Sequence, residues 1–100
     1  MTISITEEQQ NILVVMTGEL DTPESIKIQP DIDRLVTLAS KDIVIDCSKL
    51  TYIASAGLRQ MLLLSKETGS HNKKVILQHL TPYVAGTFQN THTDIMFTIE

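Results

Sequence analysis

One continuous stretch, residues 43–65, decides the fold, and it reads IVIDCSKLTYIASAGLRQMLLLS. Its first part, Ile43–Ile45, is an apolar run that predicts a buried strand ending at Asp46. After a turn at Ser55–Gly57, apolar side chains recur at helical spacing and predict a helix. The positions that share this spacing are Leu58, Met61, Leu62 and Ser65. A strand, a turn and a helix in this order are typical of a parallel α/β sheet.

Two strands are predicted ahead of this stretch. Ile3 and Ile5 alternate with polar residues, which is typical of an edge strand. The run Ile12–Met16 is continuously apolar and predicts a buried strand, with Gly18 ending it. The residues between the two strands are polar, so we expect the chain to begin with a hairpin.

A first helix is predicted between the hairpin and residue 43. Thr22 followed by Pro23 is typical of a helix start, with Thr22 as the N-cap and Pro23 in the first helical position. Pro30 then interrupts, because a proline inside a helix removes a hydrogen bond and clashes with the preceding turn. We therefore expect the main part of this helix to begin near Pro30 and to run to Leu38.

The remaining elements complete an alternating order. We expect the long helix to stop at Gly69, and three further elements to follow: a strand at 73–77, a short helix at 81–88 that begins with Thr81 as N-cap, and a last strand over Ile95, Phe97 and Ile99. The order is β-β-α-β-α-β-α-β. It predicts an α/β fold, a single domain over residues 1–100 with a mixed, largely parallel sheet and helices packed on it.

The composition excludes several classes of function. Eight basic and twelve acidic residues give a formal charge of −4, which repels nucleic-acid backbones. The aliphatic runs are too short to insert into a membrane, and the first residues show no signal-peptide pattern. Cys47 is the one cysteine, and His71, His79 and His92 lack ligand spacing, so neither a metal site nor a cofactor is expected. We expect a cytoplasmic binding domain.

Three polar residues follow predicted strands, where sites of parallel sheets tend to form: Asp21, Asp46 and Ser55. Ser55 has two interpretations, an N-cap of the long helix or an exposed phosphate acceptor at that helix's N-terminus. Asp21 and Asp46 likewise have two, as cap or turn carboxylates or as acids that flank Ser55. Residue types alone leave both pairs of alternatives open.

Two enzyme-like or signalling alternatives fit less well. A receiver domain phosphorylated on Asp46 needs an acidic pair after the first core strand and a late lysine, and neither is present. A serine hydrolase needs a glycine two residues before its nucleophile, where this chain has Ile53. The sequence therefore predicts no catalytic residue and no enzyme.

The chain resembles the STAS domain family, named for sulfate transporters and anti-sigma factor antagonists. The resemblance is carried by Gly18-Glu19-Leu20-Asp21, by Val44-Ile45-Asp46, and by Ser55-Ala56-Gly57-Leu58. It spans nearly the whole chain. Where many members have an aspartate directly before the serine, this chain has Ala54.

The resemblance implies an anti-sigma factor antagonist. In that family the serine matching Ser55 is phosphorylated by an ATP-binding serine kinase, often the anti-sigma factor itself, and a PP2C-type phosphatase reverses the modification. The unphosphorylated antagonist binds its partner and releases the sigma factor. The resemblance implies that the patch around Ser55 binds the partner; its other members are Asp21, Asp46, Ala54, Ala56, Gly57 and Leu58. A non-phosphorylated docking subunit of a membrane transporter or lipid-transport complex is the alternative.

Overall fold

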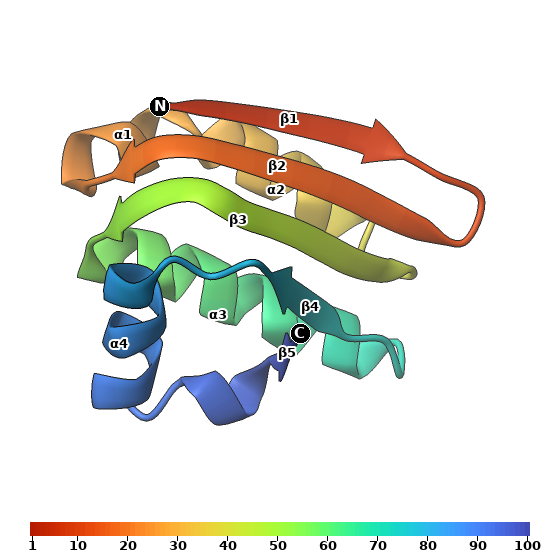
Figure 1. Cartoon of the computed structure of the whole chain (residues 1–100). Helices are drawn as coiled ribbons and strands as arrows, with labels where there is room; N and C mark the ends of the chain where they lie inside the picture. Colours follow the sequence, from red (N-terminus) through yellow and green to blue (C-terminus); the bar gives the residue numbers. More distant parts are fainter.

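The computed structural model describes residues 1–100 as one sheet with helices on it (Figure 1). The strands are β1 (Thr2–Glu7), β2 (Asn11–Leu20), β3 (Asp42–Ile53), β4 (Val75–Gln78) and β5 (Thr98–Ile99). The helices are α1 (Thr22–Lys27), α2 (Gln29–Thr37), α3 (Ser55–Ser70) and α4 (Pro82–Asn90), with a short 3₁₀ helix at Asp94–Met96. This confirms the predicted α/β order, except that the first helix is divided in two.

The sheet is mixed and largely parallel, as predicted. Its strands lie in the order β1-β2-β3-β4-β5, with β1 antiparallel to β2 and every later pair parallel. Figure 1 shows α2 and α3 behind the sheet and α4 near the ends of β3 and β4. Because β2 and β3 are parallel neighbours, the turns that follow them lie at the same edge of the sheet.

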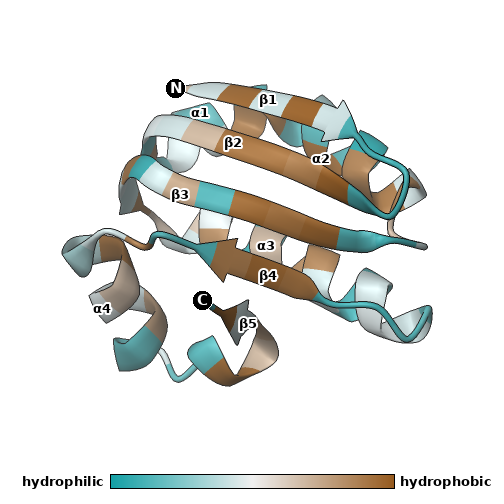
Figure 2. Cartoon of the chain, turned by 45° about the vertical axis from the view of Figure 1, so that its right-hand side comes forward, coloured by the Kyte–Doolittle hydropathy of each residue, from teal (hydrophilic) through white to brown (hydrophobic).

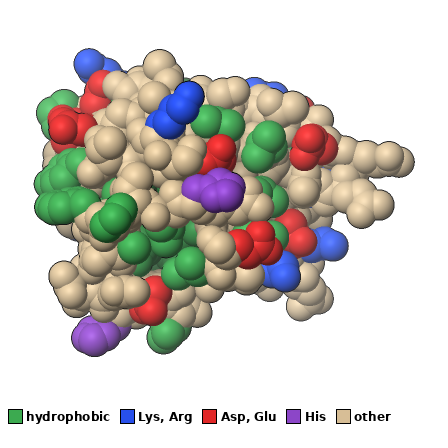
Figure 3. All heavy atoms as spheres, in the orientation of Figure 1, with side chains coloured by type: hydrophobic (Ala, Val, Ile, Leu, Met, Phe, Trp, Pro, Cys, Tyr) green, Lys and Arg blue, Asp and Glu red, His purple; other side chains and the backbone are tan.

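The core lies between the sheet and the helices behind it. Along β2, the residues Ile12, Val14 and Met16 are fully buried and alternate with half-buried ones, as expected for a strand with one covered face. They join a cluster of buried side chains that includes Leu35 of α2 and Leu64 of α3. Figure 2 shows the apolar middle of β2, β3 and β4 that supplies most of this cluster. The opposite face of the sheet, in Figure 3, mixes apolar and polar side chains.

Both central strands are longer than predicted. Gly18 does not end β2: it lies inside the strand with φ +108°, between two irregularities of the β2–β3 register. Asp46 does not end β3, which continues to Ile53. Beyond Asp46, β3 pairs with β2 alone. Its other edge meets the start of α4, where Thr81 Oγ1 donates to the Leu50 carbonyl over 2.8 Å.

The helix boundaries differ in detail from the predicted ones. Asp21, not Thr22, is the N-cap of α1. Pro30 interrupts the helix as predicted, and it lies in the first turn of α2, where its missing N–H costs no hydrogen bond. Helix α3 passes Gly69 and ends at Ser70. The last predicted strand is mostly wrong, because Ile95 belongs to the exposed 3₁₀ helix and only Thr98–Ile99 pair with β4.

Candidate functional site

The candidate site is the edge of the sheet where β2 and β3 end together. Leu20 and Ile53 are paired residues at these two ends, and the Ala54 N–H donates to the Leu20 carbonyl over 2.9 Å. The chain then turns at Ala54, which has extended backbone angles, and α3 begins at Ser55. The strand ends therefore hold the first turn of α3 beside the start of α1.

Ser55 is exposed, and its hydroxyl has no hydrogen-bond partner within the chain. The capping interpretation of Ser55 is wrong, because the cap position of α3 belongs to Ala54, one residue earlier. A methyl side chain cannot accept a hydrogen bond, and the first turn of α3 contains no acidic residue. The N–H groups of this turn therefore carry an uncompensated partial positive charge next to a free hydroxyl.

Gly57 lets α3 approach the end of β2. A Cβ atom at Gly57 would lie 2.6 Å from Leu20 Cγ and 2.7 Å from Leu20 Cδ2, closer than carbon atoms can approach. Gly57 and Leu58 are both buried, since they lie on the side of α3 that packs on the sheet. These two residues of the predicted partner-binding patch therefore support the turn from beneath, while Ala54, Ser55 and Ala56 reach the surface.

Asp21 lies at the same edge and caps the neighbouring helix. Its Oδ1 accepts a hydrogen bond of 2.9 Å from the Glu24 backbone N–H. The side chain is half-buried, and it directly follows Leu20, whose carbonyl holds Ala54. The structure therefore brings Asp21 and Ser55 to one edge and assigns the Asp21 carboxylate a structural bond.

Asp46 lies elsewhere, so it does not flank Ser55 as expected. It pairs with Val15 and Gln78 in the middle of the sheet, whereas Ile53 pairs with Leu20. Val15 and Leu20 are about 16 Å apart at the usual rise of a strand. The Asp46 carboxylate accepts a 2.9 Å hydrogen bond from the Ser48 backbone N–H, which lowers the pKa of Asp46. Asp46 is a turn-type carboxylate within β3.

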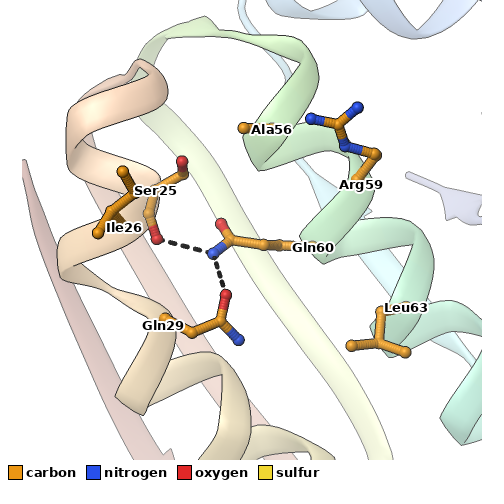
Figure 4. Close-up of a pocket in the computed structure, with 7 residues that line it drawn as sticks. All are labelled: Ser25, Ile26, Gln29, Ala56, Arg59, Gln60 and Leu63. Carbon is orange, nitrogen blue, oxygen red and sulfur yellow. Dashed lines mark hydrogen bonds between the residues drawn. The ribbon is translucent and has the colours of Figure 1, made fainter.

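A groove beside Ser55 was not predicted from the sequence. It has a volume of about 350 Å³ and lies between α3 and the α1–α2 segment (Figure 4). Its lining residues are Ser25, Ile26, Gln29, Ala56, Arg59, Gln60 and Leu63. Ala56 follows Ser55 directly, so the groove opens next to the exposed hydroxyl.

The floor of the groove is a polar link between helices. Gln60 Nε2 donates to the Ser25 carbonyl over 2.7 Å and to Gln29 Oε1 over 2.9 Å, as Figure 4 shows. The Gln60 side chain is only 9% exposed, and its Oε1 is the one buried side-chain oxygen or nitrogen without a hydrogen-bond partner. The only sequence sign of this link is a glutamine on the mostly apolar buried side of α3.

Three further properties concern metal ligands, the cysteine thiol and membrane-spanning helices. No three His, Cys, Asp or Glu side chains lie together so as to hold a metal ion. Cys47 is buried, and burial together with the charge of Asp46 raises the pKa of its thiol to about 12. No helix combines the length and apolar character needed to cross a membrane.

One comparison identifies the family to which the chain is similar. The family model described as STAS domain matches residues 2–100. The curated protein BtrV of Bordetella bronchiseptica, named as a candidate anti-sigma factor antagonist, is 26% identical over 78 residues, which cover 78% of this chain and 67% of BtrV.

Solved structures show the same fold at low identity. The anti-sigma factor antagonist SpoIIAA, in its unphosphorylated form, superposes with a TM-score of 0.81 at 18% identity, over 99% of this chain and 88% of that one. The phosphorylated form of SpoIIAA, from Bacillus, superposes with a TM-score of 0.74 at 17% identity, over 99% of this chain and 91% of that one. A candidate anti-sigma factor antagonist from Thermotoga maritima superposes with a TM-score of 0.84 at 16% identity, over 97% of this chain and 84% of that one.

Proposed function

The chain belongs to the STAS domain family, and we propose that it is an anti-sigma factor antagonist switched by phosphorylation of Ser55. The unphosphorylated chain binds an anti-sigma factor that is also an ATP-binding serine kinase, and so releases the sigma factor. The names of BtrV and SpoIIAA support the first part of this proposal, and the solved phosphorylated form of SpoIIAA supports the second.

The observation that carries the proposal is the state of the Ser55 hydroxyl. It is exposed, unbonded and located at an uncapped helix N-terminus, where added negative charge is favourable. A phosphate adds a charge of roughly −1.5 to −2 to this surface. Since Ser55 begins α3 and supports no neighbouring residue through its side chain, the modification changes the surface and leaves the fold in place.

The chain acts as a binding protein and phosphate acceptor, and the kinase supplies the catalysis. No base contacts the Ser55 hydroxyl, so the serine is not activated as a nucleophile within this chain. Transfer forms an Oγ–P bond at Ser55, releases ADP from ATP, and passes the hydroxyl proton to a base of the kinase. A PP2C-type phosphatase hydrolyses this bond and restores the serine.

The test is mass spectrometry after incubation with ATP and the serine kinase encoded nearest to this gene. We expect one phosphate on the wild-type chain, none on Ser55→Ala, and one on the control variant Ser70→Ala, which alters an exposed serine at the other end of α3. Ser55→Ala should also bind the kinase persistently in the presence of ATP. Phosphate that persists in Ser55→Ala, or a wild-type chain that no partner kinase modifies, overturns the proposal and favours a non-phosphorylated docking subunit.

A further inference from the structure

Arg59 is the one charged residue that lines the groove, and it is unpaired. It is exposed, and it makes neither an ion pair nor a side-chain hydrogen bond within the chain. The other arginine, Arg34, pairs with Glu7 over 3.3 Å. On a chain with a formal charge of −4, a free guanidinium in a groove is a feature that the fold does not explain.

The geometry of α3 directs Arg59 toward Ser55. The two residues are four positions apart in one helix, so their side chains lie on the same face. Side chains of a helix also tilt toward its N-terminus, which is the end that carries Ser55. Figure 4 shows the Arg59 guanidinium turned back along α3 toward Ala56, the residue next to Ser55.

The groove has the character of a protein-binding surface. Two exposed apolar side chains flank it, Ile26 at 71% and Leu63 at 40% exposure, and arginine is enriched in such interfaces. Its only charge is positive, which complements a carboxylate.

We propose that Arg59 binds a carboxylate of an apolar, acidic segment of the partner protein, and that phosphate on Ser55 captures the same guanidinium and so removes it from the groove. This inference rests on the proposed function, because it takes Ser55 as the modified residue. Phosphate and guanidinium form bidentate, charge-assisted hydrogen bonds, so an intramolecular phosphate competes well with a partner's carboxylate. The modification thus repels the partner and also withdraws a contact that the partner needs.

The capture is tested without any kinase, by placing phosphoserine at position 55 during translation. The second pKa of the phosphate, about 6 when free, is followed by ³¹P NMR titration. We expect this pKa to rise by about 0.5 in Arg59→Gln relative to wild type, because a neighbouring cation favours the dianion. Arg59→Lys should restore part of the difference, and the control Arg34→Gln should match wild type. Equal pKa values in wild type and Arg59→Gln overturn the capture.

The second arm measures affinity for the partner kinase without ATP. Without phosphate, Arg59→Gln should weaken binding about tenfold, as expected for a lost interfacial charge pair, and Arg34→Gln should have no effect. Phosphoserine 55 should cost less affinity in Arg59→Gln than in wild type, because the arginine is already absent. Additive effects of phosphate and Arg59→Gln overturn the competition. If phosphoserine leaves wild-type binding unchanged, the proposed switch itself fails, while the ³¹P result still decides the capture.

Discussion

Helices α1 and α3 begin side by side at the same edge of the sheet, and their first turns differ. Helix α1 is closed: Asp21 caps it, and Glu24 adds a second carboxylate to its first turn. Helix α3 is open: Ala54 at its cap position has no oxygen, and its first turn contains no acid. Both helices follow parallel neighbours, β2 and β3, so the strands do not cause the difference.

The difference shows how one residue separates a capped helix end from an uncapped one. An aspartate at the cap of α1 satisfies that helix and leaves little attraction for another anion. At α3 the polar side chain comes one residue later, at Ser55, where it points to solvent and leaves the helix end unsatisfied. The first turn of α3 thus retains a free hydroxyl and a free partial charge, the two requirements of a favourable phosphate site.

The largest change in stability is expected from Gly57→Ala, where α3 contacts Leu20 at the end of β2. The added methyl collides with Leu20, the residue before the Asp21 cap, so stability should fall by about 1–3 kcal/mol. The control is Gly69→Ala on the same helix, where a Cβ meets nothing within 4 Å. That variant should gain about 0.5–1 kcal/mol. Urea unfolding measures both, and equal effects would refute the close approach.

Removing the N-cap of α1 is the second test. Asp21→Ala leaves the Glu24 N–H without its acceptor, and the loss of such a cap costs about 1 kcal/mol. The matched control is Asp33→Ala, an exposed aspartate of α2 that caps no helix and accepts one exposed hydrogen bond, from Gln29 Nε2. It should change stability by less than about 0.5 kcal/mol. Unfolding in urea separates the two. A similar small loss in both variants would show that the Asp21 bond contributes little.

The sequence predicted the elements better than their ends. Helical spacing after Ser55 and the apolar run from Ile43 identified α3 and β3 correctly, because each pattern follows from which face is buried. The end of β3 was missed, since the strand continues through Ser48 and Lys49, whose exposure depends on the absence of β4 beyond Asp46. The pattern of apolar residues does not indicate which strands are neighbours, so it does not predict where β3 ends.

The structure brings together only some of the residues of the candidate site, because their placement depends on where the strands end. Asp21 and Ser55 come together because both follow strands that really end there, while Asp46 was placed with them on a strand end that does not exist. The groove left almost no sign in the sequence. Its floor joins Gln60 to Ser25, 35 residues away, and only tertiary packing brings them together.

Adding an N-cap to α3 is the third test. Ala54→Asp supplies α3 with the cap that α1 already has, so stability should rise by about 0.5–1 kcal/mol. The new carboxylate also lies next to Ser55, so it should oppose the addition of phosphate there by like-charge repulsion. Urea unfolding measures the first effect, and the rate of phosphate incorporation measures the second. Unchanged stability would mean that the first turn of α3 is already satisfied.

Phosphate itself distinguishes the two ends of α3. Phosphoserine at Ser55 lies at the positive end of the helix and should stabilise the chain by about 0.3–1 kcal/mol at low salt. Phosphoserine at Ser70, the last residue of α3, lies at the negative end and should destabilise it by a similar amount. Thermal unfolding of the two forms, each made by incorporation of phosphoserine during translation, compares them. Destabilisation at both positions would contradict the open N-terminus.

The smallest effect is expected from Asp46→Asn, which tests whether acids outside the edge matter. Asp46 lies in mid-strand, away from Ser55, so the variant should bind the partner kinase with wild-type affinity and accept phosphate normally. Its stability should fall slightly at pH 7, because the Ser48 N–H stabilises the carboxylate and lowers the pKa of Asp46. A lowered folded pKa contributes stability above the unfolded value, about 3.9, and loses it as the pH falls through the folded pKa. The difference from wild type should therefore vanish in acid, and weaker partner binding by Asp46→Asn would extend the site beyond the strand ends.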